Sequence, residues 1–129
     1  MLNLKRNMKK WQNHKFSSGT INGDDFIEFL KDSKSDLKAM CKEHELKVYA
    51  FNKNHYCFSA VLTDGEKFVY ISQSDVRWSD PDRILIRSMK GPRDYTGGMN
   101  QYCSWEDVGE KAVEIINYLK KREAMSNAR

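Results

Sequence analysis

The chain has 129 residues, of which 40% are hydrophobic and 12% aromatic, and these proportions are typical of a folded domain rather than a disordered chain. No apolar run approaches the roughly 18 residues that a membrane-spanning helix needs. The basic N-terminus also lacks the apolar stretch of a secretory signal. The three cysteines are odd in number and widely spaced, so we expect free thiols, no disulfide framework and a cytoplasmic location.

The positive charge is unevenly distributed along the chain. The net charge is +4, yet five of the 22 basic residues lie within residues 1–23, which hold no acidic residue. The rest of the chain is therefore close to neutral, with 17 basic and 18 acidic residues. We interpret residues 1–19 as a basic N-terminal arm and residues 20–129 as a single domain. The overall basicity then describes the arm and not the surface of the domain.

The first element after the arm is a helix. Asn22 is a suitable N-cap, and Asp24 and Asp25 lie in the first turn, where the helix dipole favours acidic side chains. Apolar residues then recur at helical spacing as far as Cys41, which predicts a helix over 24–45. The polar run 32–36 marks a point where this helix could divide into two.

Four strand patterns follow the helix, at 47–52, 55–62, 67–73 and 83–89. The run 52–54 is typical of a tight turn, and 63–66 contains Gly65, which can adopt a positive φ. Because the connections are short, the strands are expected to form an antiparallel meander.

The last element is a second helix that begins at Ser104. Ser104 and Asp107 have the spacing of a capping box, and the apolar stripe that follows predicts one buried face. That stripe comprises Trp105, Val108, Ala112, Ile115, Ile116 and Leu119. The predicted fold class is α+β: an antiparallel meander of three to four strands between an N-terminal and a C-terminal helix, with both helices on one face.

The segment 83–103 is the first candidate site, because cations, glycines and polar groups alternate along it. Arginine offers forked donors suited to phosphate or carboxylate, and glycine-rich loops can present backbone amides to an anion. Tyr95 and Tyr102 add stacking groups. With the arm, the predicted anion- or nucleic-acid-binding residues are Lys5, Arg6, Lys9, Lys10, Arg83, Arg87, Lys90, Arg93, Gly97, Gly98 and Asn100. The alternative is a structured loop in which Arg87 or Arg93 pairs with a nearby carboxylate.

The sheet itself is the second candidate site. Alternation along the predicted strands sorts their residues into an aliphatic face and an aromatic one. The aromatic face would comprise Tyr49, Phe51, Tyr56, Phe58, Phe68 and Tyr70. Such a patch needs a cover, because soluble monomers rarely expose one that large. The cover would be the protein's own core, a second subunit, or bases stacked on the rings.

No motif for catalysis, metal binding or a cofactor is present in the sequence. The histidines lack metal-ligand spacing, and no phosphate loop or nucleophile elbow is found. An enzyme would need Cys103, His55 and Asp94 to converge. We therefore expect a non-enzymatic binding protein for an anionic partner, chiefly nucleic acid or a nucleotide. The alternative is a small protein-interaction module, such as an inhibitor or adaptor from a phage or other mobile element. Such a module could be a homodimer.

Overall fold

A computed structural model describes residues 24–54, 57–73, 83–94 and 98–127 of the chain. Within them lies one antiparallel five-stranded sheet with the strand order β1-β2-β3-β4-β5. The α+β class and the antiparallel meander between two helices are thus confirmed. The predicted arm, 1–19, lies outside the described residues.

The first helix, α2 (Asp24–Glu43), is continuous through the polar run 32–36. It does not divide there because Ser33 is buried on the same side as Leu37 and Met40, so the apolar face continues across the run. The chain leaves the helix through Glu45, whose φ of 59° lies in the left-handed region. The amide of Leu46 then donates to the carbonyl of Cys41 at 2.7 Å.

The strands are β1 (Lys47–Asn54), β2 (Cys57–Thr63), β3 (Phe68–Ser72), β4 (Ile84–Ser88) and β5 (Gln101–Cys103). The predicted turn at 52–54 is wrong, because Asn52 and Lys53 pair with Ser59 and Phe58 inside the first hairpin. The predicted turn at 63–66 is confirmed. Asp64 Oδ1 accepts from the amides of Glu66 and Lys67, and Gly65 has a φ of 101°. The short strand β5 was not predicted.

The last helix begins with a 3-10 turn, η1 (Trp105–Asp107), and continues as α3 (Val108–Asn127). The capping box takes another form, because Ser104 Oγ donates to the carboxylate of Asp107 at 2.8 Å rather than accepting from a backbone amide. The predicted stripe is buried or half-buried along its whole length.

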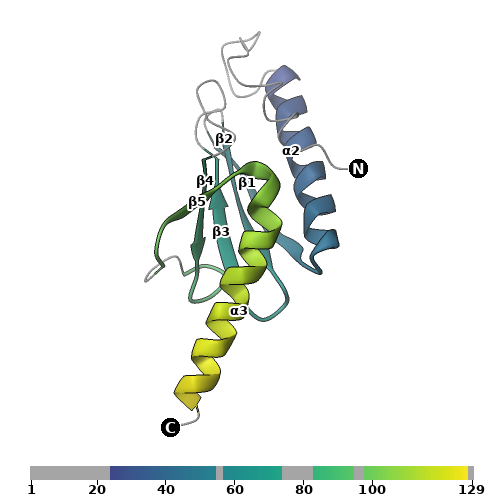
Figure 1. Ribbon diagram of the computed structural model, residues 1–129. Helices are drawn as coiled ribbons and strands as arrows, with labels where there is room; N and C mark the ends of the chain where they lie inside the picture. The colour runs from purple at the N-terminus through teal and green to yellow at the C-terminus, as the bar shows by residue number, and fades with distance from the viewer. Residues whose placement is uncertain (1–23, 55–56, 74–82, 95–97, 128–129) are drawn as a thin grey trace.

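Both helices pack on the same face of the sheet, and the core lies between them and the strands (Figure 1). Ile71, Ile86 and Leu62 are wholly buried on the sheet side of this core, and Trp105 and Phe29 on the helix side. The C-terminal turns of α3 project past the lower end of the strands (Figure 1). The opposite face of the sheet carries no described helix, and we call it the helix-free face.

Candidate functional site

Two arginines lie on the helix-free face: Arg87 within β4, and Arg83 just before it. Ile84 and Ile86 point into the core, where they are 1% and 0% exposed. Since strand residues alternate between faces, Arg83, Leu85 and Arg87 point the other way. The sequence places these cations on the outer side of the strand for this reason.

Arg83 lies over the ring of Tyr102, with its guanidinium carbon 4.5 Å from the ring centroid. Tyr102 belongs to β5 and stands opposite Leu85, so it shares the helix-free face. Arg83 is exposed, and Tyr102 remains 50% exposed. A cation at this distance is attracted by the ring quadrupole, which favours this arrangement of the two groups by about 0.5–1 kcal/mol at an exposed site.

Arg87 is half-buried and stands opposite Tyr70 on the neighbouring strand. Its Nη2 donates to the carbonyl of Gly98 at 2.9 Å, while its Nε is buried without a hydrogen-bond partner. In the described part of the chain, neither Arg87 nor Arg93 forms an ion pair with a carboxylate. The alternative in which these arginines pair internally therefore has no support in the described residues.

Gly98 lets the chain pass close to the end of β4. A Cβ added at Gly98 would lie 2.3 Å from the Ser88 carbonyl oxygen and 3.0 Å from Arg87 Nε. Among the described glycines, Gly65 alone has a positive φ, so Gly98 is not required by its backbone angles. Close approach, not a special φ, is what requires Gly98.

The other predicted cations of this segment lie on a turn after β4. The amide of Asp94 donates to the carbonyl of Gly91 at 3.2 Å, which closes a turn with Pro92 and Arg93 at its centre. Lys90 and Arg93 are exposed, and so is Asn100. These residues are accessible near Arg87, but among the described residues their side chains make no hydrogen bond or ion pair with Arg83 or Arg87.

The prediction of one aromatic face is wrong. Phe51 and Phe58 stack at 4.9 Å in or against the core, on the helix-covered face. Tyr49, Phe68 and Tyr70 occupy the helix-free face, with the first two rings edge-on at 5.2 Å. Ala60 stands opposite Ile71 and Val61 opposite Tyr70, so Phe58 shares the face of Ile71 and not, as predicted, that of Phe68 and Tyr70.

A bulge between Val48 and Ala50 has the same effect within β1. It shifts the alternation, so that Phe51 points to the core although Tyr49 does not. Six predicted site residues lie outside the described residues, and the structure does not test them: Lys5, Arg6, Lys9, Lys10, Tyr56 and Gly97.

The helix-free face carries no carboxylate among its described strand residues, but it does carry Lys47 and Arg87, with Arg83 just before β4. Its middle is closed to solvent, because Val61 and Ser59 of β2 are 1% and 6% exposed. Accessible groups therefore lie toward its two edges: Tyr49 on β1, and Arg83 with Tyr102 beside β4 and β5. Lys47 was not predicted as a site residue.

Two of the three cysteines, Cys41 and Cys103, are poorly suited to nucleophilic catalysis. Burial raises the pKa of the Cys41 thiol to about 12. Burial, reinforced by the charge of Asp107, raises the pKa of the Cys103 thiol to about 11. Both thiols are therefore protonated at neutral pH, whereas the thiolate is the reactive form. His55, the base suggested for Cys103, lies outside the described residues.

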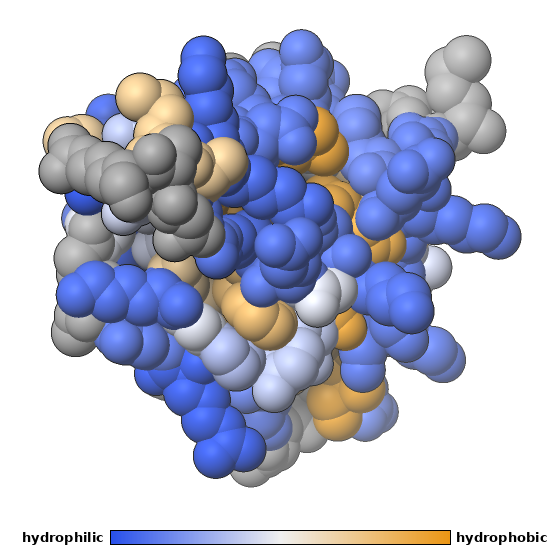
Figure 2. Space-filling model, turned by 90° about the horizontal axis from the view of Figure 1, so that it is seen from below, coloured by the Kyte–Doolittle hydropathy of each residue, from blue (hydrophilic) through white to orange (hydrophobic). Residues whose placement is uncertain are grey.

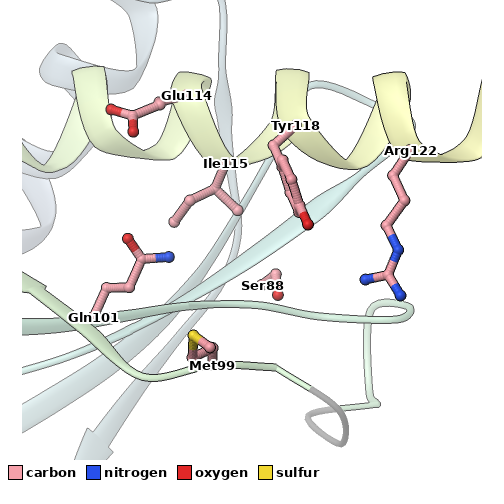
Figure 3. A pocket seen from close by; sticks show the side chains of 7 residues that line it. All are labelled: Ser88, Met99, Gln101, Glu114, Ile115, Tyr118 and Arg122. Carbon is pink, nitrogen blue, oxygen red and sulfur yellow. The ribbon is translucent and has the colours of Figure 1, made fainter.

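A hollow of about 470 Å³ separates α3 from β4 and β5 (Figure 3). The sequence reasoning missed it, although the spacing of Tyr118, Lys121 and Met125 along α3 marks a second stripe on that helix. The described residues contain no group of three or more histidines, cysteines or acidic residues placed to bind a metal. Within the same residues, neither helix is long and apolar enough to cross a bilayer.

No protein-family model matches this chain, and comparisons with curated proteins and with solved structures find no match either.

Proposed function

We propose that the protein is a non-enzymatic, cytoplasmic binding protein for nucleic acid, which it contacts through the β4–β5 edge of the helix-free face. The observation that carries the proposal is the pairing of Arg83 with the half-exposed ring of Tyr102, next to the half-buried Arg87. No carboxylate among the described strand residues of that face competes with a phosphate for these cations.

The chemistry of this edge suits a single strand. Proteins that bind single-stranded nucleic acid combine cations that follow the backbone with aromatic rings on which bases stack. Tyr102 offers a ring, Arg83 a guanidinium plane, and Arg87 a cation that donates to the Gly98 carbonyl and has no ion pair among the described residues. Lys90 and Arg93 are exposed on the turn that follows. The raised pKa values of Cys41 and Cys103 support a binding role rather than catalysis by a thiol.

A fluorescence anisotropy titration with labelled single-stranded DNA and RNA tests the proposal. Affinity should fall steeply as salt rises, because bound cations displace the counterions of the phosphates. Tyr102→Ala should weaken binding by about 10-fold, since base stacking contributes about 1–3 kcal/mol per base. Arg83→Ala should have a similar effect, and the double variant should lose less than the product of the two, because the groups act together.

Lys34→Ala is the matched control. Lys34 lies 5.8 Å from the ring centroid of Phe51 on the helix-covered face, so the variant removes a cation from a comparable pair on the other side of the sheet. It should leave binding nearly unchanged. An affinity that does not respond to salt, or that falls equally in Lys34→Ala and Arg83→Ala, would contradict the proposed site.

The basic arm should add phosphate contacts. Replacing Lys5, Arg6, Lys9 and Lys10 with alanine should reduce the slope of log affinity against log salt by up to about 3, at about 0.7 per lost contact on a single strand. An unchanged slope would remove the arm from the proposal and leave the β4–β5 edge as its only support.

A second candidate function is a protein-interaction module. It is favoured by Tyr49, which stands on the edge strand β1, is 50% exposed and packs edge-on against Phe68. Tyrosine is enriched at protein interfaces. Failure to bind nucleic acid, together with a protein partner whose binding Tyr49→Ala abolishes, would favour this candidate.

A further inference from the structure

Helix α3 carries a second stripe of side chains that its own core does not use. Glu114, Tyr118, Lys121 and Met125 are separated by four, three and four residues, so they lie along one side of the helix. Tyr118 is 62% exposed and Met125 66% exposed. The core-facing stripe of the same helix is buried, so this second stripe is available to another molecule.

The second stripe borders the hollow between α3 and the edge of the sheet. Ile115, Tyr118 and Arg122 point from α3 toward Ser88 and Met99, as Figure 3 shows. Met99 is 74% exposed. A second hollow, of about 530 Å³, shares Tyr118 and Arg122 and reaches Met125.

The residue types of this surface favour a protein partner. Tyrosine, methionine and arginine are enriched in interfaces, and methionine adapts its shape to the surface it meets. Figure 2 views the molecule from the end where α3 projects. It shows a mostly hydrophilic surface with separate hydrophobic patches, so this stripe is not part of one large apolar area.

Tyr118 lies between two lining residues of the hollow that carry opposite charges, Glu114 and Arg122. Glu114 lies four residues before Tyr118, and Arg122 lies four residues after it. Glu114 bonds to Lys111 at 3.3 Å at the exposed surface, and in the described residues Arg122 has no ion pair. The neighbouring Lys120 is engaged elsewhere, with Asp64 and Glu66 of the β2–β3 turn.

We propose that this surface docks a second copy of the chain, with the two α3 helices antiparallel and Tyr118 at the two-fold axis. In that arrangement residue i of one copy meets residue j of the other, and j meets i. Glu114 of each copy then faces Arg122 of the other. A parallel arrangement would place like charges together, so the charges also fix the direction of the pair.

The dimer should be weak. One helix stripe and Met99 bury less than the roughly 800 Å² per partner of a standard stable interface, which points to a dissociation constant on the order of micromolar. The contact between the two α3 helices leaves Arg83 and Tyr102 accessible on the helix-free face, because the hollow lies on the helix side of the sheet. The proposal is therefore independent of nucleic-acid binding.

Sedimentation equilibrium of the full chain tests this dimer, over concentrations from about 1 µM to about 500 µM that bracket such an affinity. The average molar mass should rise with concentration from that of one chain toward that of two. Arg122→Glu and Glu114→Arg should each weaken the dimer by about 10-fold or more, because each places like charges in contact. The double variant exchanges the charges and should restore an affinity close to that of the original chain.

Lys31→Glu, an exposed charge reversal on α2, is the control and should leave the dimer unchanged. Circular dichroism of each variant verifies that it is folded. A chain that stays monomeric throughout would overturn the proposal. So would a dimer that neither single reversal weakens, or one that the double exchange fails to restore, because the pairing of Glu114 with Arg122 would then be absent.

Discussion

The backbone amide of Gly109 donates to the sulfur of Met40 at 3.2 Å, so α3 meets α2 at a residue without a side chain. A Cβ at Gly109 would lie 2.5 Å from His44 Cδ2 and 2.9 Å from Met40 Cγ. His44 is half-buried just after the end of α2. This close crossing sets how the two helices share the face of the sheet.

Gly109→Ala should destabilise the protein, although alanine is the better helix former. Overpacking typically costs about 1–3 kcal/mol, and the gain in helix propensity offsets up to about 1 kcal/mol of it. A net loss of about 1 kcal/mol should appear as a lower urea midpoint. In the control Gly91→Ala, the added Cβ meets no atom within 4 Å, so the midpoint should stay the same or rise. A midpoint that rises in Gly109→Ala would contradict the close crossing.

The β2–β3 turn should make the protein less stable in acid. Burial by itself would raise the pKa of Asp64, but hydrogen bonds from Lys120 and from the amides of Lys67 and Glu66 outweigh it and lower the pKa to about 2. The ordinary value is 3.8. Because the folded pKa lies below the unfolded one, this stabilisation is complete above about pH 4 and is lost as the pH falls toward 2.

Asp64→Asn removes the charge of residue 64 but keeps an oxygen that can accept from the amides of Glu66 and Lys67. The variant therefore measures the contribution of the charge apart from that of the turn's hydrogen bonds. The loss at pH 7 should stay below about 1 kcal/mol, as for other surface ion pairs, and salt should reduce it. Urea unfolding at pH 7 and pH 3 measures both effects. The difference between Asp64→Asn and the original chain should shrink at pH 3, and a difference that grows there would contradict the assigned pKa direction.

The thiol of Cys103 should react slowly in the folded protein. With a pKa of about 11, its thiolate fraction at pH 8 is small, and the rate should continue to rise with pH beyond pH 9. A Cys57→Ser background limits fast reaction with a disulfide reagent to Cys103, because Cys41 is buried. Asp107→Asn should increase the rate by removing the charge that opposes ionisation. A rate that levels off near pH 8 would reveal a reactive thiolate and revive a catalytic role.

The helices and the class of fold were predictable because their signals are local. The stripe from Trp105 to Leu119 has one period and one buried face. The turn at Gly65 uses a positive φ, which glycine adopts more readily than other residues. The strand β5 left no such signal, since three residues are too few to show alternation. It is defined by pairing with β4, which depends on residues distant in the chain.

The faces of the sheet were less predictable than its strands. The pairing of Val61 with Tyr70 places an aliphatic and an aromatic residue on the same side, and no local pattern distinguishes this register from one displaced by a residue. No local pattern in the sequence indicates the bulge after Val48 either. Arg87 was predicted as an anion-binding residue from its type and segment, but the partner of its guanidinium, the carbonyl of Gly98, could come only from the structure.

Gly98→Ala should lower both the stability of the protein and its affinity for nucleic acid. Its Cβ would lie 2.3 Å from a backbone oxygen, that of Ser88, so the chain must shift, and the bond from Arg87 Nη2 to the Gly98 carbonyl should lengthen or break. We expect a loss of about 1–3 kcal/mol in the free energy of unfolding. Where nucleic acid binds as proposed, affinity should also fall, because Arg87 loses the contact that positions it.

Asn100→Ala, an exposed change two residues further on, is the matched control and should leave stability nearly unaltered. Arg87→Lys completes the comparison: it keeps the charge but loses the planar fork. If position matters, Arg87→Lys and Gly98→Ala should both weaken binding at low salt, where charge alone is most effective. If Arg87→Lys binds as well as the original chain while Gly98→Ala only loses stability, Arg87 acts as a point charge and the close approach of Gly98 serves the fold.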